Sequence, residues 1–142
     1  MANTYTRLLY HVVFSTKRRV PSIAKARRAD LYAYLWGIHK NLKCHLYRIG
    51  GVDDHVHLFT SIHPKLAVAD YVEKVKTGST GWIKREGVFA DWPGWQDGYG
   101  AFTAALENKA SLVAYIIGQE EHHRTVTFTE ELKGLLERAG VK

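Results

Sequence analysis

The sequence predicts an α+β fold of the split βαβ type, also called ferredoxin-like or RRM-like. In this fold a four-stranded antiparallel sheet has helices on one face, and here C-terminal helices follow. Strand-like and helix-like segments alternate in the order β-α-β-β-α-β, and 46% of the 142 residues are hydrophobic, enough for one core. No repeat or Ser/Pro-rich linker divides the chain. We therefore expect residues 1–142 to form a single domain whose other sheet face is available for function.

The first half of the chain predicts three strands and a helix. Residues 8–15 (LLYHVVFS) are nearly all apolar, β-branched or aromatic, which is typical of a strand buried on both faces. Residues 44–49 and 55–62 are two further strands, joined by the hairpin loop Gly-Gly-Val-Asp-Asp at residues 50–54. Between the first two strands, an amphipathic helix is predicted by the apolar stripe Leu31, Tyr34, Leu35, Ile38 and Leu42.

The second half predicts three helices and the fourth strand. The strand lies near residues 98–103, and the second of these helices runs from about Asn108 to His123. Thr127 and Glu130 form a capping-box pattern that opens a last short helix ending at Gly140. The first helix is weakened by two glycines, each costing about 1 kcal/mol. Its buried face is predicted to comprise Val68, Val72, Val75, Ser79 and Trp82.

Positive charge is concentrated in one segment. The net charge is +6, and residues 17–28 contain six basic residues and no acidic one. Such a patch suits a phosphate backbone, although a plain solvated surface explains it equally well on charge alone. Aromatic residues, 12% of the chain, add stacking surfaces that favour single-stranded nucleic acid. The predicted DNA-binding residues are Lys17, Arg18, Arg19, Arg27 and Arg28.

Several classes of protein are excluded by simple counts. The longest segment without Asp, Glu, Lys or Arg has ten residues, which is too short to cross a bilayer. The early apolar run is followed by basic residues instead of a small-residue cleavage site, so we expect a cytoplasmic protein without a signal peptide. Cys44 is the single cysteine, which excludes an internal disulfide and C-x-x-C motifs. No Walker-type loop is present, so no nucleotide cofactor is expected.

The motif His55-Val56-His57 lies in the third predicted strand. Because side chains alternate along a strand, both imidazoles project from one face and lie side by side. Two imidazoles can form half of a site for a divalent metal and leave positions open for other ligands. A pair of exposed strand histidines is the simpler interpretation, since the motif alone is a weak signal.

A second group of polar residues lies in the third helix. Tyr115, Gln119 and His122 share one helix face, one to two turns apart. Each of them alone would be interpreted as a packing or surface residue. Together with the two histidines, they could hold a metal that polarises a phosphodiester while the tyrosine attacks phosphorus. The neighbouring face is expected to anchor the helix to the sheet through Leu112, Val113, Ile116 and Ile117.

These motifs together resemble the single-tyrosine HUH transposases of insertion sequences, which move as single-stranded DNA. The resemblance covers nearly the whole chain and rests on residues 10–17, residues 50–58, Trp95 with residues 98–102, Tyr115-Ile116, and Gln119 with residues 121–123. It implies that Tyr115 is the nucleophile and that His55, His57 and Gln119 bind Mg²⁺ or Mn²⁺. It further implies cleavage and rejoining of single-stranded DNA at element ends through a 5′-phosphotyrosine intermediate. DNA hairpins and a homodimer, in which the tyrosine helix can complete the partner's site, are the implied partners.

The residues alone are also compatible with two other functions. One is a non-catalytic module that binds single-stranded nucleic acid on an RNA-recognition-like sheet, although the aromatic pattern of such sheets is not visible in the central strands. The other is a small metal-dependent hydrolase in which the metal activates water and Tyr115 is a bystander. Only the transposase would leave protein covalently attached to DNA.

Overall fold

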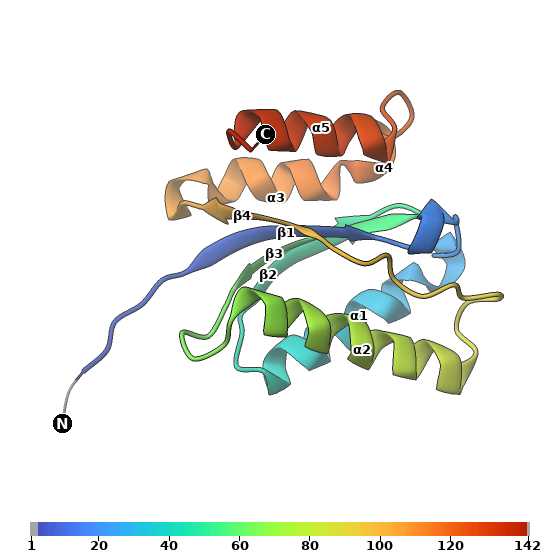
Figure 1. Ribbon diagram of the computed structural model, residues 1–142, viewed down its shortest axis with the longest axis horizontal. Coiled ribbons are helices and arrows are strands. Elements are labelled where there is room, and N and C mark those ends of the chain that lie inside the picture. The colour runs from blue at the N-terminus through green and yellow to red at the C-terminus, as the bar shows by residue number, and fades with distance from the viewer. Residues whose placement is uncertain (1–2, 142) are drawn as a thin grey trace.

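The computed structural model describes residues 3–141 as three layers with a sheet in the middle (Figure 1). The strands are β1 (Leu9–Ser15), β2 (Leu46–Gly51), β3 (His55–Ser61) and β4 (Gly100–Ala104). The helices are α1 (Lys25–Asn41), α2 (Val68–Glu86), α3 (Lys109–Ile117), α4 (Gln119–His122) and α5 (Phe128–Arg138). All neighbouring strands are antiparallel, in the order β2-β3-β1-β4. The predicted α+β fold is therefore confirmed.

The second sheet face is covered, although the sequence led us to expect it free. Helices α1 and α2 lie on one face, whereas α3, α4 and α5 lie on the other (Figure 1). Ile116 of α3 packs there against Leu9 and Phe59. A hydrophobic stripe shows that a helix has a packing partner but does not show which face of the sheet it will cover. The expectation of a free face was wrong for this reason.

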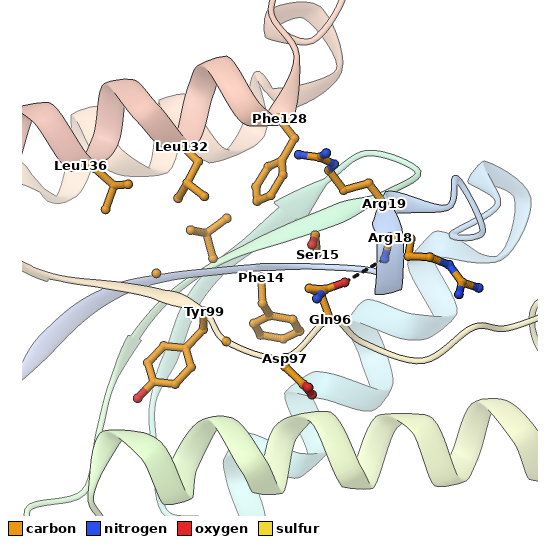
Figure 2. A pocket seen from close by; sticks show the side chains of 13 residues that line it. Phe14, Ser15, Arg18, Arg19, Gln96, Asp97, Tyr99, Phe128, Leu132 and Leu136 are labelled. Carbon is orange, nitrogen blue, oxygen red and sulfur yellow. Dashed lines mark hydrogen bonds between the residues drawn. The ribbon is translucent and has the colours of Figure 1, made fainter. Parts of the chain in front are cut away.

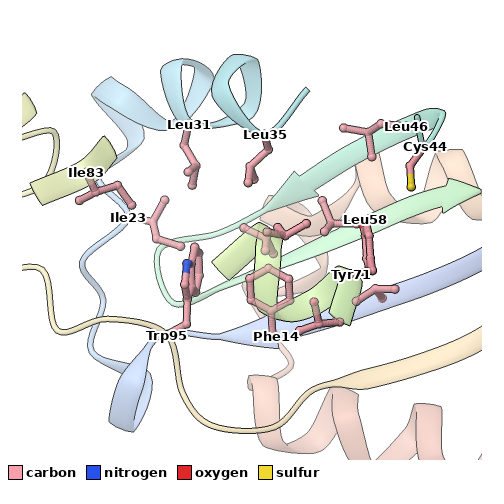
Figure 3. Close-up of a cluster of buried hydrophobic side chains, with 14 of the residues drawn as sticks. Phe14, Ile23, Leu31, Leu35, Cys44, Leu46, Leu58, Tyr71, Ile83 and Trp95 are labelled. Carbon is pink, nitrogen blue, oxygen red and sulfur yellow. The ribbon is translucent and has the colours of Figure 1, made fainter. Parts of the chain in front are cut away.

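Alternation along the strands separates an apolar core from a polar layer. In β1 and β3, side chains such as Phe14 and Leu58 point toward α1 and α2 and join the main core (Figure 3). Trp95 closes that core by packing edge-on against Phe14 and donating a hydrogen bond to Ser79 of α2 at 2.9 Å. The alternate residues of both strands point toward α3 and α5, and several of them are histidines. The fold thus places polar side chains between the sheet and the C-terminal helices.

Two glycines permit close packing of helices. A Cβ at Gly78 in α2 would lie 3.1 Å from Cδ1 of Ile38 in α1, so the predicted weak point of α2 is where the two helices approach each other. A Cβ at Gly50 in β2 would lie 2.4 Å from the carbonyl oxygen of Ile116. Only glycine allows that approach, and it brings the C-terminal end of α3, next to Tyr115, onto the sheet.

The predicted helix from Asn108 to His123 is two helices in the structure. α3 ends at Ile117, Gly118 caps it, and the short helix α4 follows. Ile117 was expected to anchor the helix, but it is 56% exposed, whereas Ile116 is completely buried. Adjacent residues on a helix point about 100° apart, and the buried stripe next to the helix end includes only the earlier of the two.

Membrane-spanning helices are not found in the described part of the chain. Within residues 3–141, no helix combines the length and the apolar character needed to cross a bilayer. The longest of them, α2, has 19 residues and carries charged side chains along its length.

Candidate active site and metal centre

Three buried histidines project from β1 and β3 toward the C-terminal helices. His55 and His57 lie on the same face of β3, with ring centroids 5.1 Å apart, as the strand alternation predicts. His11 on the neighbouring strand β1 is hydrogen-bonded through Nε2 to Nδ1 of His57 at 2.8 Å. His55 and His57 are completely buried, which excludes the interpretation as exposed surface histidines.

Helices α3 and α4 bring Tyr115 and Gln119 to these histidines. The amide oxygen of Gln119 lies 3.2 Å from Nε2 of His55. The ring of Tyr115 packs edge-on against that of His57, with centroids 5.6 Å apart. His122 also lies beside Tyr115, at 5.5 Å between ring centroids. The structure therefore brings together the four residues that the sequence assigned to one site.

Glu131 of α5 lies at the centre of the cluster, and the sequence analysis missed it. Its Oε1 atom is 2.9 Å from Nε2 of His57 and 3.1 Å from Nε2 of both His55 and His123. Its Oε2 atom accepts hydrogen bonds from the Tyr115 hydroxyl and, at 3.1 Å, from the Gln119 amide. One signal was available in the sequence, because this acidic residue lies on the apolar side of an amphipathic helix.

The cluster has the composition of a metal centre. The ligand atoms of His55, His57, His123 and Glu131 all lie within 4.8 Å of one another. The Glu131 oxygen lies 2.9–3.1 Å from the three imidazole nitrogens. Neighbouring ligand atoms around a single ion are separated by a similar distance when each metal–ligand bond is about 2.1 Å long. The amide oxygen of Gln119 is a further available ligand. These residues therefore fit a divalent metal ion.

Charges inside the cluster stabilise one another. Burial opposes protonation of His55, but hydrogen bonds to the carboxylates of Asp54 and Glu131 outweigh it and raise the pKa of His55 to about 9. Burial also opposes the charge on Glu131, yet hydrogen bonds from His55, His57 and Tyr115 keep the pKa of this carboxyl well below its usual range. The pKa of the Tyr115 hydroxyl is raised, first by burial and then by the hydrogen bond to Glu131. Tyr115 is therefore held protonated by burial and by its hydrogen bond to Glu131.

Of the three cavities nearest the cluster, two lie along α5 and the third, of about 400 Å³, is lined by His123. The first has a volume of about 500 Å³, and we call it the arginine cavity because Arg18 and Arg19 line it (Figure 2). Phe128 and Leu132 form its wall on α5, and Phe128 packs on the His55 ring at 4.4 Å between centroids. The second has a volume of about 870 Å³, and we call it the tyrosine cavity because Tyr115 lines it. The tyrosine cavity thus reaches Tyr115, whereas the arginine cavity reaches the ring of Phe128 that packs on His55.

The predicted DNA-binding residues divide into two groups. Lys17, Arg18 and Arg19 form an exposed 3₁₀ turn, and Arg19 donates a hydrogen bond to Thr129 on α5.

The second group, Arg27 and Arg28, lies on α1. Arg27 is exposed and pairs with Asp30 at 2.6 Å. Arg28 is mostly buried and donates to the Ile23 carbonyl at 2.9 Å and to Glu120 at 3.1 Å. Arg18 and Arg19 line the arginine cavity, whereas Arg28 lines a cavity of about 400 Å³ together with His123 of the cluster.

Comparison with known families assigns the chain to one of them. The family model for IS200-like transposases matches residues 4–119, most of the chain. The chain belongs to this family. The match confirms the resemblance seen in the sequence and ends at Gln119, so α5 and Glu131 lie beyond the matched residues.

Solved structures similar to this transposase have the same fold. A Deinococcus radiodurans R1 protein described as a candidate transposase has 21% sequence identity and a TM-score of 0.63, covering 84% of this chain and 96% of its own. A REP-associated tyrosine transposase bound to a REP hairpin has 11% identity and a TM-score of 0.64, covering 89% and 76%. A search of curated proteins found no similar sequence.

Proposed function

We propose that this transposase cleaves and rejoins single-stranded DNA at the ends of an insertion sequence, with Tyr115 as nucleophile. The observation that carries the proposal is the position of the Tyr115 hydroxyl, which is hydrogen-bonded to Glu131 at the centre of a buried cluster suited to a metal ion. Membership of the IS200-like family agrees with this chemistry. The RNA-recognition-like binding module gives no reason for these side chains to converge.

The tyrosine acts through its phenolic oxygen. That oxygen attacks the phosphorus of a phosphodiester, and the bond from phosphorus to the 3′ oxygen breaks. The phenolic proton passes to solvent water, and water in turn protonates the released 3′ oxygen. The products are a 5′-phosphotyrosine link and a free 3′-hydroxyl. A different 3′-hydroxyl then attacks the link, which restores Tyr115 and joins the new strands without ATP.

We propose His55, His57 and Gln119 as ligands of a divalent ion, Mg²⁺ or Mn²⁺. When bound, the ion would polarise a non-bridging oxygen of the phosphodiester and offset its negative charge. His11 holds His57 in place by the hydrogen bond at 2.8 Å, and Asp54 holds His55 in the same way, also at 2.8 Å. Such outer contacts orient ligands before an ion arrives.

We propose that DNA hairpins near the element ends are the substrate, held by the basic residues. Arg18 and Arg19 line the arginine cavity next to the turn that contains Lys17, and Arg28 lines a further cavity with His123. Arg27 and Arg28 on α1 remain predicted phosphate contacts. We further propose that the protein acts as a homodimer in the cytoplasm. The break at Gly118 between α3 and α4 is a place where the tyrosine segment could be exchanged with the partner.

A denaturing gel tests the proposed function. The chain is incubated with labelled single-stranded DNA from the flanks of its own gene, with Mn²⁺ or with a chelator. We expect a covalent protein–DNA band with metal, no such band with chelator, and none for Tyr115→Phe, which should still fold and bind the hairpin. Tyr99→Phe is the matched control, because Tyr99 is the next exposed tyrosine beside the site. Product without a covalent band would favour the hydrolase, and binding without cleavage would favour the binding module.

A further inference from the structure

The tyrosine cavity has an unusual charge pattern for a space beside a metal centre. Its wall includes His11 and His122 as well as Tyr115, and it contains no carboxylate side chain. Arg138, at the end of α5, is the one residue in this wall with a permanent charge. A group in the tyrosine cavity therefore meets a single guanidinium in the wall, and the Glu131 carboxylate only where it is bonded to the Tyr115 hydroxyl.

Helix geometry directs Arg138 toward the nucleophile. Glu131 and Arg138 are seven residues apart, two helical turns, and so lie on the same side of α5. The guanidinium extends back along the helix, since a Cβ at Gly134 would lie only 3.5 Å from its Nη1 atom. It thus lies about one turn from Glu131, whose Oε2 atom accepts the hydrogen bond of Tyr115.

The guanidinium is not neutralised by a neighbour. Among residues 3–141, none of the salt bridges of the structure includes Arg138. By contrast, Arg27, Arg28 and Arg124 each pair with a carboxylate. An unpaired guanidinium presents a planar set of donors that matches two oxygens of a phosphate group.

We propose that Arg138 binds the scissile phosphodiester in the tyrosine cavity. The inference rests on the proposed function, because it assigns this anion to the reaction of Tyr115. Attack by the phenolic oxygen increases the negative charge on the phosphate oxygens. A guanidinium beside them stabilises that charge more in the transition state than in the bound substrate. Arg138 is therefore a catalytic residue supplied by a helix that lies beyond the family match.

The rate of covalent adduct formation at saturating hairpin DNA tests this role. We expect Arg138→Gln to lower the rate by about 30-fold or more, the effect of removing one charged donor at a transition state. Hairpin affinity should change less than about 3-fold, since most phosphate contacts lie elsewhere. Arg138→Lys should recover part of the rate. Arg85→Gln is the matched control on α2, across the sheet, and should react like the unaltered chain. Equal rates for Arg138→Gln and the unaltered chain would overturn the proposal.

Binding of inorganic phosphate separates this inference from the proposed function. In an NMR titration of the unaltered chain, we expect phosphate to shift the Arg138 Nε–H resonance, and we expect Arg138→Gln to abolish the accompanying shifts at Tyr115. This result without any covalent DNA adduct would refute the proposed function and leave an anion site at Arg138. No shift at Arg138, together with normal adduct formation by Arg138→Gln, would refute the site and leave the function intact.

Discussion

Glu131 shows how much of the site depends on one carboxylate. It contacts side chains from β3, α3 and α4, although it comes from α5. Because both oxygens are buried and hydrogen-bonded, loss of the charge leaves Asp54 as the remaining carboxylate partner of His55. Removal of one charge from a buried ion pair lowers the stability of a protein far more than removal of one from a surface pair.

We expect Glu131→Gln to lower the free energy of unfolding of the metal-free chain by about 2–4 kcal/mol at pH 7. Chemical denaturation measures this change. Glu137→Gln on the exposed side of α5 is the matched control and should change stability by less than about 0.5 kcal/mol. If both variants unfold at the same denaturant concentration as the unaltered chain, the carboxylate does not stabilise the cluster.

The predicted metal ligands make unequal contributions. We expect His55→Ala and His57→Ala to abolish metal-dependent cleavage, and we expect Gln119→Ala to reduce it less because a neutral amide is the weakest ligand. Imidazole ligands favour Mn²⁺ over Mg²⁺, so Mn²⁺ should support at least equal cleavage. Cleavage assays after chelation and stepwise addition of each metal measure both effects. Full activity of any of these three variants without metal would exclude the site.

At the scale of elements, α5 links the helix cap to the active site. The side chain of Thr127 accepts from the Glu130 backbone N–H at 3.2 Å, and Glu130 accepts from the backbone N–H of Thr127 at 3.0 Å. This capping box agrees with the sequence pattern. It fixes the first turn of α5, and Glu131 lies in that turn.

We expect Thr127→Ala to destabilise α5 by about 1 kcal/mol, because the first turn then lacks a partner for one backbone N–H. Hydrogen exchange of the α5 amides, measured against those of α1, should show faster exchange in α5 only. Thr125→Ala, in the loop before the helix, should leave the exchange of the α5 amides unchanged, because its side chain bonds the His122 carbonyl at the end of α4 and not the first turn of α5. Unaltered protection of α5 in Thr127→Ala would show that tertiary contacts alone hold the helix.

Local sequence patterns predicted most helices and strands, and they predicted His55 and His57 of the four-residue metal cluster. Alternation placed His55 and His57 together, and helical spacing grouped Tyr115 with Gln119, because both periods are properties of a single element. Glu131 could not be predicted in the same way, since its partners depend on how α5 docks across the sheet. The break at Gly118 and the exposure of Ile117 depend on docking as well.

For the whole molecule, the distribution of charge should control DNA affinity. Three phosphate contacts on single-stranded DNA change the slope of log K against log salt by about two units. We therefore expect reversal of Lys17, Arg18 and Arg19 to glutamate to flatten the slope by that amount, measured by fluorescence anisotropy with a hairpin. Reversal of Lys65, Lys84 and Arg85, which lie away from the site, makes the same change in net charge and should flatten the slope less. Equal slopes for both triple variants would show a general charge effect. The first variant should still cleave at saturating DNA.

Stability of the whole molecule should fall in mild acid through His39. This histidine is buried in α1, where Nδ1 donates to the Leu35 carbonyl at 2.7 Å and Nε2 accepts from the Tyr71 hydroxyl. Burial lowers the pKa of His39 from 6.5, so the unfolded chain takes up a proton that the folded chain refuses. The stabilisation is therefore complete above about pH 7 and is lost as the pH falls below 6.5.

We expect His39→Gln to flatten the dependence of unfolding free energy on pH between pH 6.5 and 5. The difference in slope from the unaltered chain is at most about 1.4 kcal/mol per pH unit, the value for one proton. Denaturant titrations at each pH measure the slope, and the surface change His45→Gln serves as control. A steeper slope in His39→Gln would contradict the account of a buried neutral imidazole.

The site of covalent attachment tests the central claim most directly. The chain is incubated with hairpin DNA and Mn²⁺, digested with nuclease and trypsin, and sequenced by tandem mass spectrometry. Trypsin should release residues 110–124 as one peptide, which contains Tyr115 and no other tyrosine. We predict that this peptide carries a nucleotide on Tyr115. A nucleotide on another residue, such as Tyr99, or cleaved DNA with no modified peptide, would contradict the account.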